Sequence, residues 1–594
     1  MGNPVNNNVS VRNTGYREQE AVEVQPDASN TGTETQFFTA AYELRFSSSM
    51  TAARLREAAS VQLQPDDPPT IGPLDYTFSY GDGSNIPPDT VQNINGDATE
   101  AAAFVLDSFG GGTPEAQLSR FNAVLEMHKG DDFFIRNFFN ALGPAKVADM
   151  MNIAANPRGD GMPADVIARF NQNIANAFSL LADNGLLNQT DMQKLVSQLT
   201  AERGWLDNEN FNPWVATDII GKAGSEKLKN MFFDAATARA LEVQQSDPRL
   251  ASELMAGAAH VLSQTSTSNQ AAHLNALRQA GNLDEFVKLA MQGEASFGSL
   301  PTLASASSGM YGERTPLNMH GLSSLMFNVA FEKYDDFGPG APTADLQRIC
   351  VEMFTAATDA LVGGTLTEHY AQSPEFKDGL SAIFREEFDA VIRENTLAVG
   401  GADRTQNYDG NLSTDGHARI EKFFQLALFT PPGGSYQGVM ASFVAGKMDA
   451  LAQSLQSGNM EAFQGLSRDG NGFSQTEGAR LLGELLGMVH NGLKDAVTAA
   501  KGDRDKEIAA TKGFLDVVAS LIPLPAGRLI TQVGLTTVAE SIKSFGTQAA
   551  AEQLVDEGRL DNAGIVDQLY NGILAQLGDL SDVFKASYGA VKRD

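Results

Sequence analysis

The stretch that most constrains the fold runs from Ser474 to Thr537. Ser474 and Glu477 have the spacing of a capping box, in which each side chain accepts a hydrogen bond from a backbone N–H at a helix start. Leucine and valine then recur at helical spacing as far as Leu493. This periodicity predicts a long amphipathic helix with one apolar stripe.

Four glycines lie close to that stripe, namely Gly478, Gly483, Gly487 and Gly492. Each glycine lowers helix stability by about 1 kcal/mol relative to alanine. Close approach of a second helix would offset this loss, and Phe514–Leu521 is the nearest apolar partner along the chain. We therefore expect the segment Phe514–Thr537 to pack against the Leu481–Leu493 helix.

Residues 514–535 form the most apolar long window of the chain. A helix that spans a bilayer needs ~20 uninterrupted apolar residues. Two charged residues and two prolines interrupt this window: Asp516, Pro523, Pro525 and Arg528. The sequence thus favours a packed helical hairpin over a membrane insertion.

The charge balance excludes several classes of partner. Lys and Arg number 43 against 73 Asp and Glu, which gives a net charge of −30 at pH 7. Nucleic acids and anionic lipids both favour basic protein surfaces. We expect no nucleic-acid partner and no membrane contact at neutral pH, and we expect protein partners instead.

Helix-start signals recur from Asp97 onward. Thr113-Pro114-Glu115 combines an N-cap threonine with proline at the first helical position, Pro163 begins another apolar stripe, and Thr190 with Gln193 has capping-box spacing. Gly143-Pro144 is expected to stop a helix that begins at Asp131. The pattern predicts an all-α fold built as a multi-block helical array.

Composition divides the chain into blocks, and the first residues show no periodicity. Short alternations near residues 37–80 allow one small β-hairpin. The predicted organisation is a disordered tail at 1–36, a small mixed or extended segment at 37–95, a helical block at 96–295, a linker at 296–316, a helical block at 317–395, a linker at 396–416, and a C-terminal helical block with the apolar hairpin at 417–594.

Two loops resemble calcium-binding turns, because each contains the sequence Asp-Gly-Asn. When the loop around Asp409 is aligned on Gly410, Gly416 occupies the position of the bidentate carboxylate. The loop around Asp469 ends in the same way on Gly478. We interpret both loops as turns that cap the following helix, and we expect no metal and no cofactor.

Other chemically suggestive residues have simpler interpretations. His417 and Glu421 lie one helical turn apart and are interpreted as a solvent-exposed pair. The single cysteine, Cys350, is expected to be buried and excludes an internal disulfide. Trp205 and Trp214 are interpreted as core anchors beneath a loop. The sequence contains no nucleophile elbow and no complete phosphate loop, so we predict no catalytic or cofactor-binding residues.

Three segments carry a resemblance to a known class of protein. They are FFNALGPAKVADMMNIA, NIANAFSLLADNGLLNQTDMQKLVSQL, and GARLLGELLGMVHNGLKDAV followed by FLDVVASLIPLP. Together they resemble the all-helical pre-toxin regions of secreted bacterial polymorphic toxins, over about residues 130–540. Such regions precede a catalytic domain, whereas only a short helical segment follows here, so the resemblance implies delivery and no toxin activity.

The first residues suggest a route of export. They contain no lysine before Lys129, they are rich in Asn, Thr and Ser, and they lack the apolar core of a Sec signal peptide. This composition is similar to the N-terminal signals of type III secretion substrates. It implies a protein that is cytoplasmic before export and is then secreted without a Sec signal.

Three hypotheses for function remain open. The first is a non-enzymatic secreted helical protein, an effector, translocation or delivery module linked to virulence, whose partners are a secretion chaperone, a host protein or an assembly protein. The second is a structural or assembly protein such as a virion component. The third is an enzyme whose site is assembled from residues distant in sequence.

Overall fold

The computed structural model describes residues 98–106, 114–155, 164–201, 213–298, 320–331, 343–395 except 363 and 365, 413–430, 437–466, 473–521, 547–556 and 570–592 except 572, 575 and 576. Every described residue belongs to one compact unit, residues 74–594. The described residues form helices and turns and contain no strand, which confirms the all-α prediction. The predicted tail at 1–36 and the predicted hairpin near 37–80 lie outside the described residues.

The described helices are named here in chain order. They are α3 (Ala98–Leu106), α4 (Pro114–Met127), α5 (Asp132–Ala155), α6 (Ala164–Asp183), α7 (Gln189–Leu199), α8 (Pro213–Gly221), α9 (Glu226–Val243), α10 (Pro248–Ser263), α11 (Thr267–Gln279), α12 (Leu283–Gly298), α14 (Gly321–Phe331), α15 (Thr343–Val362), α16 (Thr367–Ala371), α17 (Pro374–Glu386), α18 (Phe388–Asn395), α20 (Ser413–Phe429), α21 (Gln437–Ser457), α22 (Gln475–Ala500), α23 (Arg504–Leu521) and α27 (Ser581–Val591), with 3-10 turns η2 (Met460–Leu466) and η3 (Gly578–Leu580).

Local capping residues explain where several helices begin. Asp247 accepts a hydrogen bond from the Leu250 N–H at the start of α10, where Pro248 takes the first helical position. The capping box of Ser474 and Glu477 at the start of α22 is present as predicted. These short-range contacts involve only residues within one helical turn.

One predicted helix start is wrong. The capping box of α7 is formed by Asn188 and Asp191, because the Asn188 side chain accepts the Asp191 N–H and the Asp191 side chain accepts the Asn188 N–H. Thr190 therefore lies inside the helix. The predicted stop at Gly143 is confirmed: its backbone angles, with φ of 75°, are not helical, so α5 consists of two helices that meet at a kink there.

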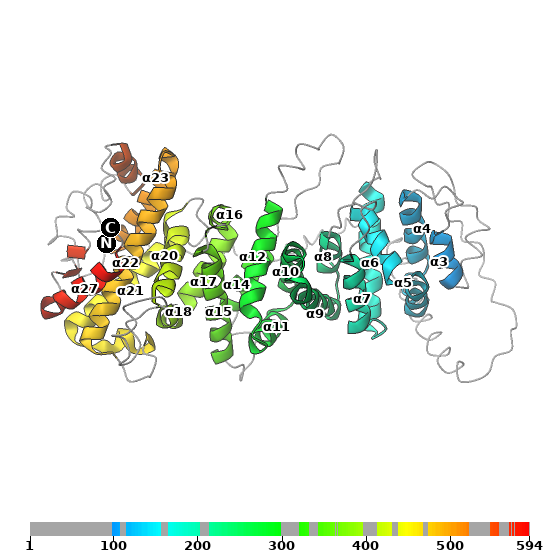
Figure 1. Cartoon of the computed structure of the whole chain (residues 1–594), viewed down its shortest axis with the longest axis horizontal. Helices are drawn as coiled ribbons and strands as arrows, with labels where there is room; N and C mark the ends of the chain where they lie inside the picture. Colours follow the sequence, from blue (N-terminus) through cyan, green and yellow to red (C-terminus); the bar gives the residue numbers. More distant parts are fainter. Residues whose placement is uncertain are drawn as a thin grey trace, which may run out of the picture. The chain divides into compact units, whose positions relative to one another are not determined.

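Helices near one another in the chain pack against each other, as Figure 1 shows for α9, α10 and α12 and for α20, α22 and α23. One continuous cluster of buried apolar side chains extends from Ala101 to Tyr588. A small second cluster lies between α23 and residues 547–556 and contains Ile508, Leu515, Ala550 and Ala551. Packing between neighbouring helices thus builds most of the core. The predicted boundaries between helical blocks and linkers stay a prediction.

Glycines lie where helices approach most closely. A Cβ atom added at Gly293 of α12 would lie 2.1 Å from the carbonyl oxygen of Ser252 on α10, and one at Gly379 of α17 would lie 2.8 Å from the carbonyl oxygen of Ser323 on α14. Nonbonded atoms do not approach so closely, so any side chain at these positions would force the helices apart.

The glycines of α22 also contact other helices, but the predicted partner is wrong for them. A Cβ atom added at Gly483 would lie 2.6 Å from the Phe584 carbonyl oxygen of α27, and one at Gly492 would lie 2.9 Å from the Glu421 carbonyl oxygen of α20. The expected partner, α23, also packs against α22, and Phe514 of α23 is buried. Residues 522–546 of the predicted hairpin lie outside the described residues.

Among the residues that the structure describes, no helix is both long enough and apolar enough to cross a membrane.

Candidate functional site

Several residues singled out in the sequence lie outside the part of the chain that is described. The Asp409 and Asp469 loops are among them, as are the side chains of Trp205 and Trp214. Within the described ranges, no group of three or more His, Cys, Asp or Glu side chains is placed to hold a metal ion. Cys350 is fully buried, as predicted.

The interpretation of His417 and Glu421 as a solvent-exposed pair is wrong. Glu421 is only 7% exposed and accepts a hydrogen bond of 2.6 Å from the Asn491 side chain of α22. The Nε2 atom of His417 lies 3.5 Å from the Oε2 atom of the buried Glu484, also on α22. Both residues of α20 face a neighbouring helix because α20 and α22 pack along their length.

The most unusual polar group is a buried carboxyl on α12, which the sequence analysis missed. Glu294 is 4% exposed, and its Oε1 atom accepts the backbone N–H of Leu322 at 3.0 Å. The N–H of Gly321 donates to the same carboxyl group. Because both donors belong to the first turn of α14, Glu294 binds the N-terminus of that helix, where backbone N–H groups have no partner within the helix.

Tyr370 of α16 completes this arrangement. Its hydroxyl lies 3.2 Å from Oε2 of Glu294 and 3.0 Å from the carbonyl oxygen of Met291. The Tyr370 ring is 1% exposed and lies 4.1 Å from the Phe376 ring, measured between centroids, so neighbouring rings hold the hydroxyl in place. We call Glu294, Gly321, Leu322 and Tyr370 the Glu294 joint, since they connect α12, α14 and α16.

Burial controls the electrostatics of this region. Removal from water raises the pKa of Glu294 to about 7, although the three hydrogen bonds to its carboxyl oppose the shift. Burial likewise raises the pKa of Tyr370 well above 10. It lowers the pKa of His260 on α10 and of His369 on α16. The neutral form is favoured in each case.

A carboxyl group that exchanges its proton near neutral pH is suited to general acid or base catalysis. In the Glu294 joint, however, the two carboxyl oxygens contact Leu322, Gly321 and Tyr370, all within the protein. The arrangement can bind and release a proton while it holds three helices together.

A second buried polar group connects α20, α22 and α27. The side-chain amide of Asn491, which is fully buried, donates to Oε1 of Glu421 at 2.6 Å and to the carbonyl oxygen of Val591 at 2.8 Å. Nearby, the Tyr588 hydroxyl lies 2.9 Å from Nδ1 of His490. We call Asn491, Glu421 and Val591 the Asn491 joint, which holds α27 against Gly483 and Gly487 of α22.

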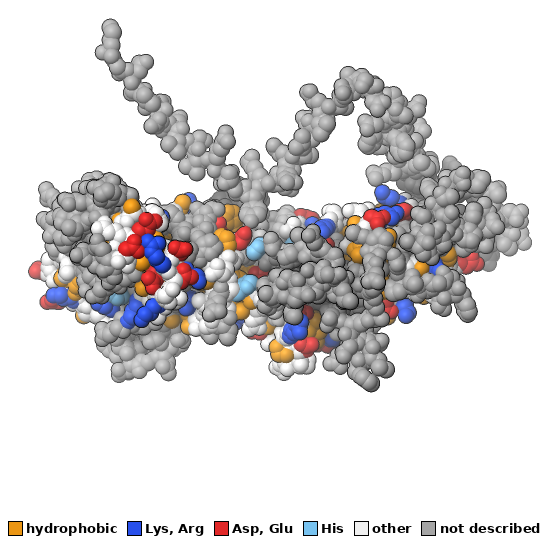
Figure 2. Space-filling view, turned by 90° about the horizontal axis from the view of Figure 1, so that it is seen from above, with side chains coloured by type: hydrophobic (Ala, Val, Ile, Leu, Met, Phe, Trp, Pro, Cys, Tyr) orange, Lys and Arg blue, Asp and Glu red, His pale blue; other side chains and the backbone are white. Residues whose placement is uncertain are grey.

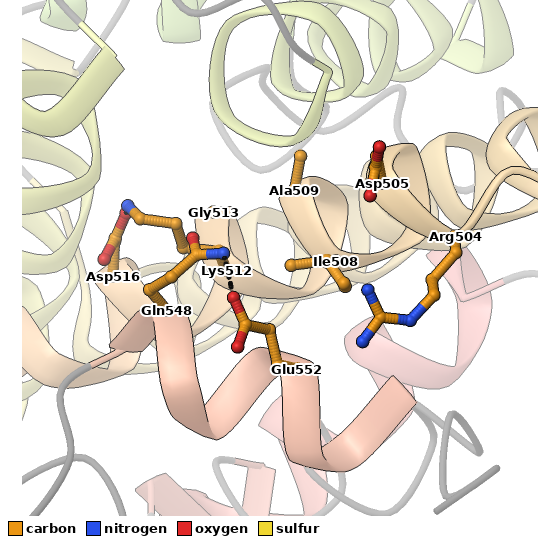
Figure 3. Close-up of a pocket in the computed structure, with 9 residues that line it drawn as sticks. All are labelled: Arg504, Asp505, Ile508, Ala509, Lys512, Gly513, Asp516, Gln548 and Glu552. Atoms are coloured by element: carbon orange, nitrogen blue, oxygen red, sulfur yellow. Dashed lines mark hydrogen bonds and ion pairs between the residues drawn. The ribbon is translucent and has the colours of Figure 1, made fainter. Parts of the chain in front are cut away.

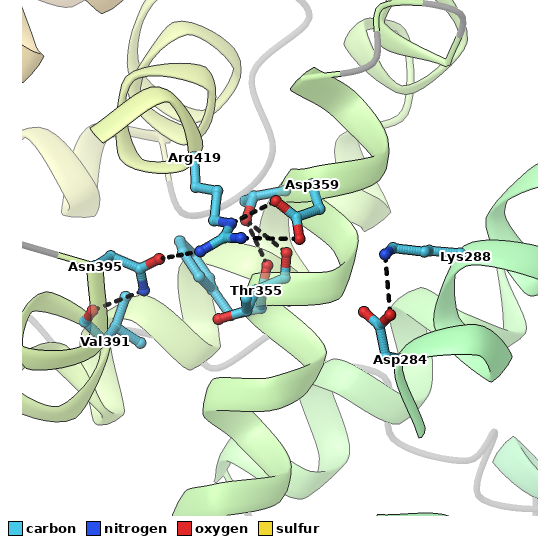
Figure 4. Close-up of polar contacts among 9 residues, drawn as sticks. Asp284, Lys288, Thr355, Asp359, Val391, Asn395 and Arg419 are labelled. Atoms are coloured by element: carbon cyan, nitrogen blue, oxygen red, sulfur yellow. Dashed lines mark hydrogen bonds and ion pairs between the residues drawn. The ribbon is translucent and has the colours of Figure 1, made fainter. Parts of the chain in front are cut away.

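A third polar contact connects α15, α18 and α20. Figure 4 shows the guanidinium of Arg419 directed at Asp359 and at Asn395, which lie on two other helices. Arg419 donates two hydrogen bonds to the Asp359 carboxylate, and Nη2 lies 3.0 Å from Oδ2. Bidentate pairs of this kind fix orientation as well as distance.

A surface pocket lies between α23 and residues 547–556 (Figure 3). Its two basic side chains are paired: Arg504 forms two hydrogen bonds of 2.9 Å with Asp556, which lies outside the pocket lining, and Lys512 lies 2.6 Å from Asp516 within it. Such exposed pairs contribute little free energy. Figure 2 shows acidic and basic side chains intermixed on the face that it displays.

Comparisons with known proteins give no relative from which a role could be transferred: no protein-family model, no curated protein and no solved structure matches this chain.

Proposed function

We propose that the protein is a non-enzymatic helical protein, exported from a bacterium without Sec processing, which acts through protein–protein contacts as an effector, translocation or delivery module. The observation that carries the proposal is how buried and half-buried polar side chains are used. In the Glu294 joint, the Asn491 joint and the Arg419 contact, they connect three helices each. Their donors and acceptors face other parts of the same chain.

Buried polar contacts of this kind favour one arrangement of helices over alternatives, because a broken contact leaves a buried polar group without a partner. A helical array fixed in this way presents a defined surface. Such a surface suits recognition of another protein, whereas a catalytic group must reach a substrate. Glu294, the carboxyl with the chemistry closest to catalysis, is only 4% exposed.

The net charge of −30 indicates the kind of partner. Complementary charge accelerates association and suppresses incorrect partners. We therefore expect a protein with a basic contact face, which would be a secretion chaperone before export and a host or assembly protein afterwards. Association with it should slow as ionic strength rises, since screening weakens attraction between exposed charges.

An export assay tests the proposal. The full chain, the chain lacking residues 1–50, and residues 1–50 fused to a reporter would be expressed in a bacterium with a working type III apparatus and in a matched strain that lacks the secretion ATPase. We expect the full chain and the fusion in the medium of the first strain only. The truncated chain should stay inside the cells, with circular dichroism as a control for its folding.

Two results would contradict the proposal. One is equal export from both strains, or export that does not depend on residues 1–50. The other is assembly of the purified full chain into large regular particles under electron microscopy, which would favour a structural or virion role.

A further inference from the structure

The Tyr370 hydroxyl has one hydrogen atom and two oxygen neighbours. These neighbours are Oε2 of Glu294 at 3.2 Å and the carbonyl oxygen of Met291 at 3.0 Å. An ionised carboxylate and a carbonyl both accept hydrogen bonds and cannot donate them. If Glu294 is ionised, one of these two contacts therefore brings oxygen lone pairs together with no hydrogen between them.

A proton on Oε2 of Glu294 resolves the conflict. The carboxyl then donates to the Tyr370 oxygen, and the Tyr370 hydroxyl donates to the Met291 carbonyl. The other carboxyl oxygen, Oε1, continues to accept the Leu322 N–H. Every contact then has one donor and one acceptor, which is the usual state of buried polar groups.

We propose that Glu294 holds a proton in the folded protein at mildly acidic pH, and that loss of this proton loosens the contacts between α12, α14 and α16. The joint is thus a proton-dependent latch. On ionisation, a charge appears in a buried site where, among the residues that the structure describes, its donors are two backbone N–H groups and a hydroxyl. Local opening that admits water relieves this charge, because burial of an ion is costly.

Opening of the latch affects other helices because of where Glu294 lies. Glu294 binds the first turn of α14, and that turn also packs tightly on α10, since a Cβ atom added at Gly321 would lie 2.4 Å from the His260 backbone nitrogen. A small shift at the start of α14 therefore disturbs α10 and α17, which both pack against α14.

Other ionisable groups lie on the helices around the joint and must be separated from Glu294 in any experiment. His320, just before α14, has Nε2 3.9 Å from Oε2 of Glu375 on α17. The further groups on helices that pack against α12 are Arg249, Glu253 and His260 of α10, His273 and Arg278 of α11, Asp345, Arg348, Glu352 and Asp359 of α15, and His369 of α16.

Glu294→Gln tests the proposal, because glutamine reproduces the protonated carboxyl: its oxygen accepts and its amide donates. Free energies of unfolding of the full-length wild type and variant would be compared from pH 4.5 to pH 8. We expect the unfolding equilibrium constants to agree near pH 4.5. Near pH 8 the wild type should unfold more readily by a factor on the order of 10².

Glu421→Gln provides the control, because it alters a buried glutamate of the Asn491 joint. It should change stability without removing the pH dependence that Glu294→Gln removes. A wild-type minus Glu294→Gln difference that is constant with pH would overturn the proposal.

Infrared spectroscopy and hydrogen exchange keep the proposal testable if Glu294→Gln does not fold. With ¹³C-labelled glutamate, the wild type should show a protonated-carboxyl band at pH 6 that disappears by pH 8.5. In Tyr370→Phe this band should remain but move to higher frequency, because the carboxyl loses its acceptor. Exchange of the Leu322 amide, corrected for its intrinsic pH dependence, should accelerate above pH 7. An unmoved band in Tyr370→Phe, or protection of Leu322 that does not change with pH, would contradict the latch.

Discussion

The Glu294 joint and the Asn491 joint each connect helices, but they differ in the number of hydrogen-bond donors that the central side chain supplies. Each connects three helices through a buried glutamate and lies beside closely packed glycines. The Asn491 amide brings two N–H donors to two oxygen acceptors, whereas the Tyr370 hydroxyl brings one O–H to two oxygens. The comparison teaches that a joint with enough donors is complete by itself, and a joint with one too few depends on a proton from solvent.

The largest expected effect comes from a change that removes the donors of the Asn491 joint. Asn491→Asp places a second carboxylate against Glu421 and leaves the Val591 carbonyl without this donor. We expect a loss of more than ~3 kcal/mol at pH 8, because two carboxylates would then face each other in a buried site. Denaturant unfolding measures it, and the loss should shrink at pH 5 as one carboxylate takes up a proton. A loss below ~1 kcal/mol at pH 8 would show that the joint does not hold α27 in solution.

The next effect concerns whether the stability of the folded protein rises or falls with pH. The pKa of Glu294 is raised to about 7, so the stability that its neutral form provides is full below pH 4.5 and is lost as pH rises through 7. The shift corresponds to about 3 kcal/mol. Burial instead lowers the pKa of His128, His260 and His369, so their contribution is full above pH 6.5 and is lost as pH falls.

Glu294→Gln removes the contribution of Glu294 to the pH dependence of stability. Among these four groups, only the three histidines should then contribute to it. Its thermal melting temperature should rise from pH 5 to pH 7 by more than that of the wild type. Scanning calorimetry across this range checks the prediction. Parallel curves for the two proteins would mean that Glu294 does not titrate between these pH values.

A smaller effect tests the close packing at the Asn491 joint. A Cβ atom at Gly483 would lie 2.6 Å from the Phe584 carbonyl oxygen, so Gly483→Ala should displace α27 and cost about 1–3 kcal/mol. The matched control is Gly589 on α27 itself, where an added Cβ meets nothing within 4 Å.

The smallest effect has the opposite sign. Gly589→Ala should stabilise the protein by about 0.5–1 kcal/mol, because alanine favours the helix and contacts no neighbour. Chemical denaturation of both glycine variants provides the comparison. If both lower stability equally, the approach of α27 to α22 is looser than the structure places it.

The sequence predicted several features that depend on neighbouring residues, although it placed the capping box of α7 at Thr190 instead of Asn188. The helix starts at Pro114 and Ser474 follow from local capping chemistry, and the apolar period predicts the helices. The partners of the α22 glycines could not be predicted, because a glycine indicates close approach without identifying which helix approaches. For the same reason, the helical spacing of His417 and Glu421 did not reveal that α22 covers both.

One feature of the sequence could have indicated the Glu294 joint. Val287, Ala290 and Met291 lie on the apolar stripe of α12, and Glu294 continues that stripe at the next helical position. An acidic residue in an apolar stripe indicates a buried carboxyl with a partner. Its partners, Leu322 and Tyr370, lie on other helices and cannot be found from the spacing within α12.

The contact between Asn491 and Val591 also has a consequence for the order of folding. These residues are 100 positions apart, so the ribosome must synthesise a long further stretch of chain before the Asn491 amide can meet its second acceptor. Contacts between distant residues form late, since a long loop must close first. Until then the glycine-lined face of α22 is exposed. A newly made chain therefore passes through a period in which another helix, from a chaperone or a second nascent chain, can occupy the place of α27.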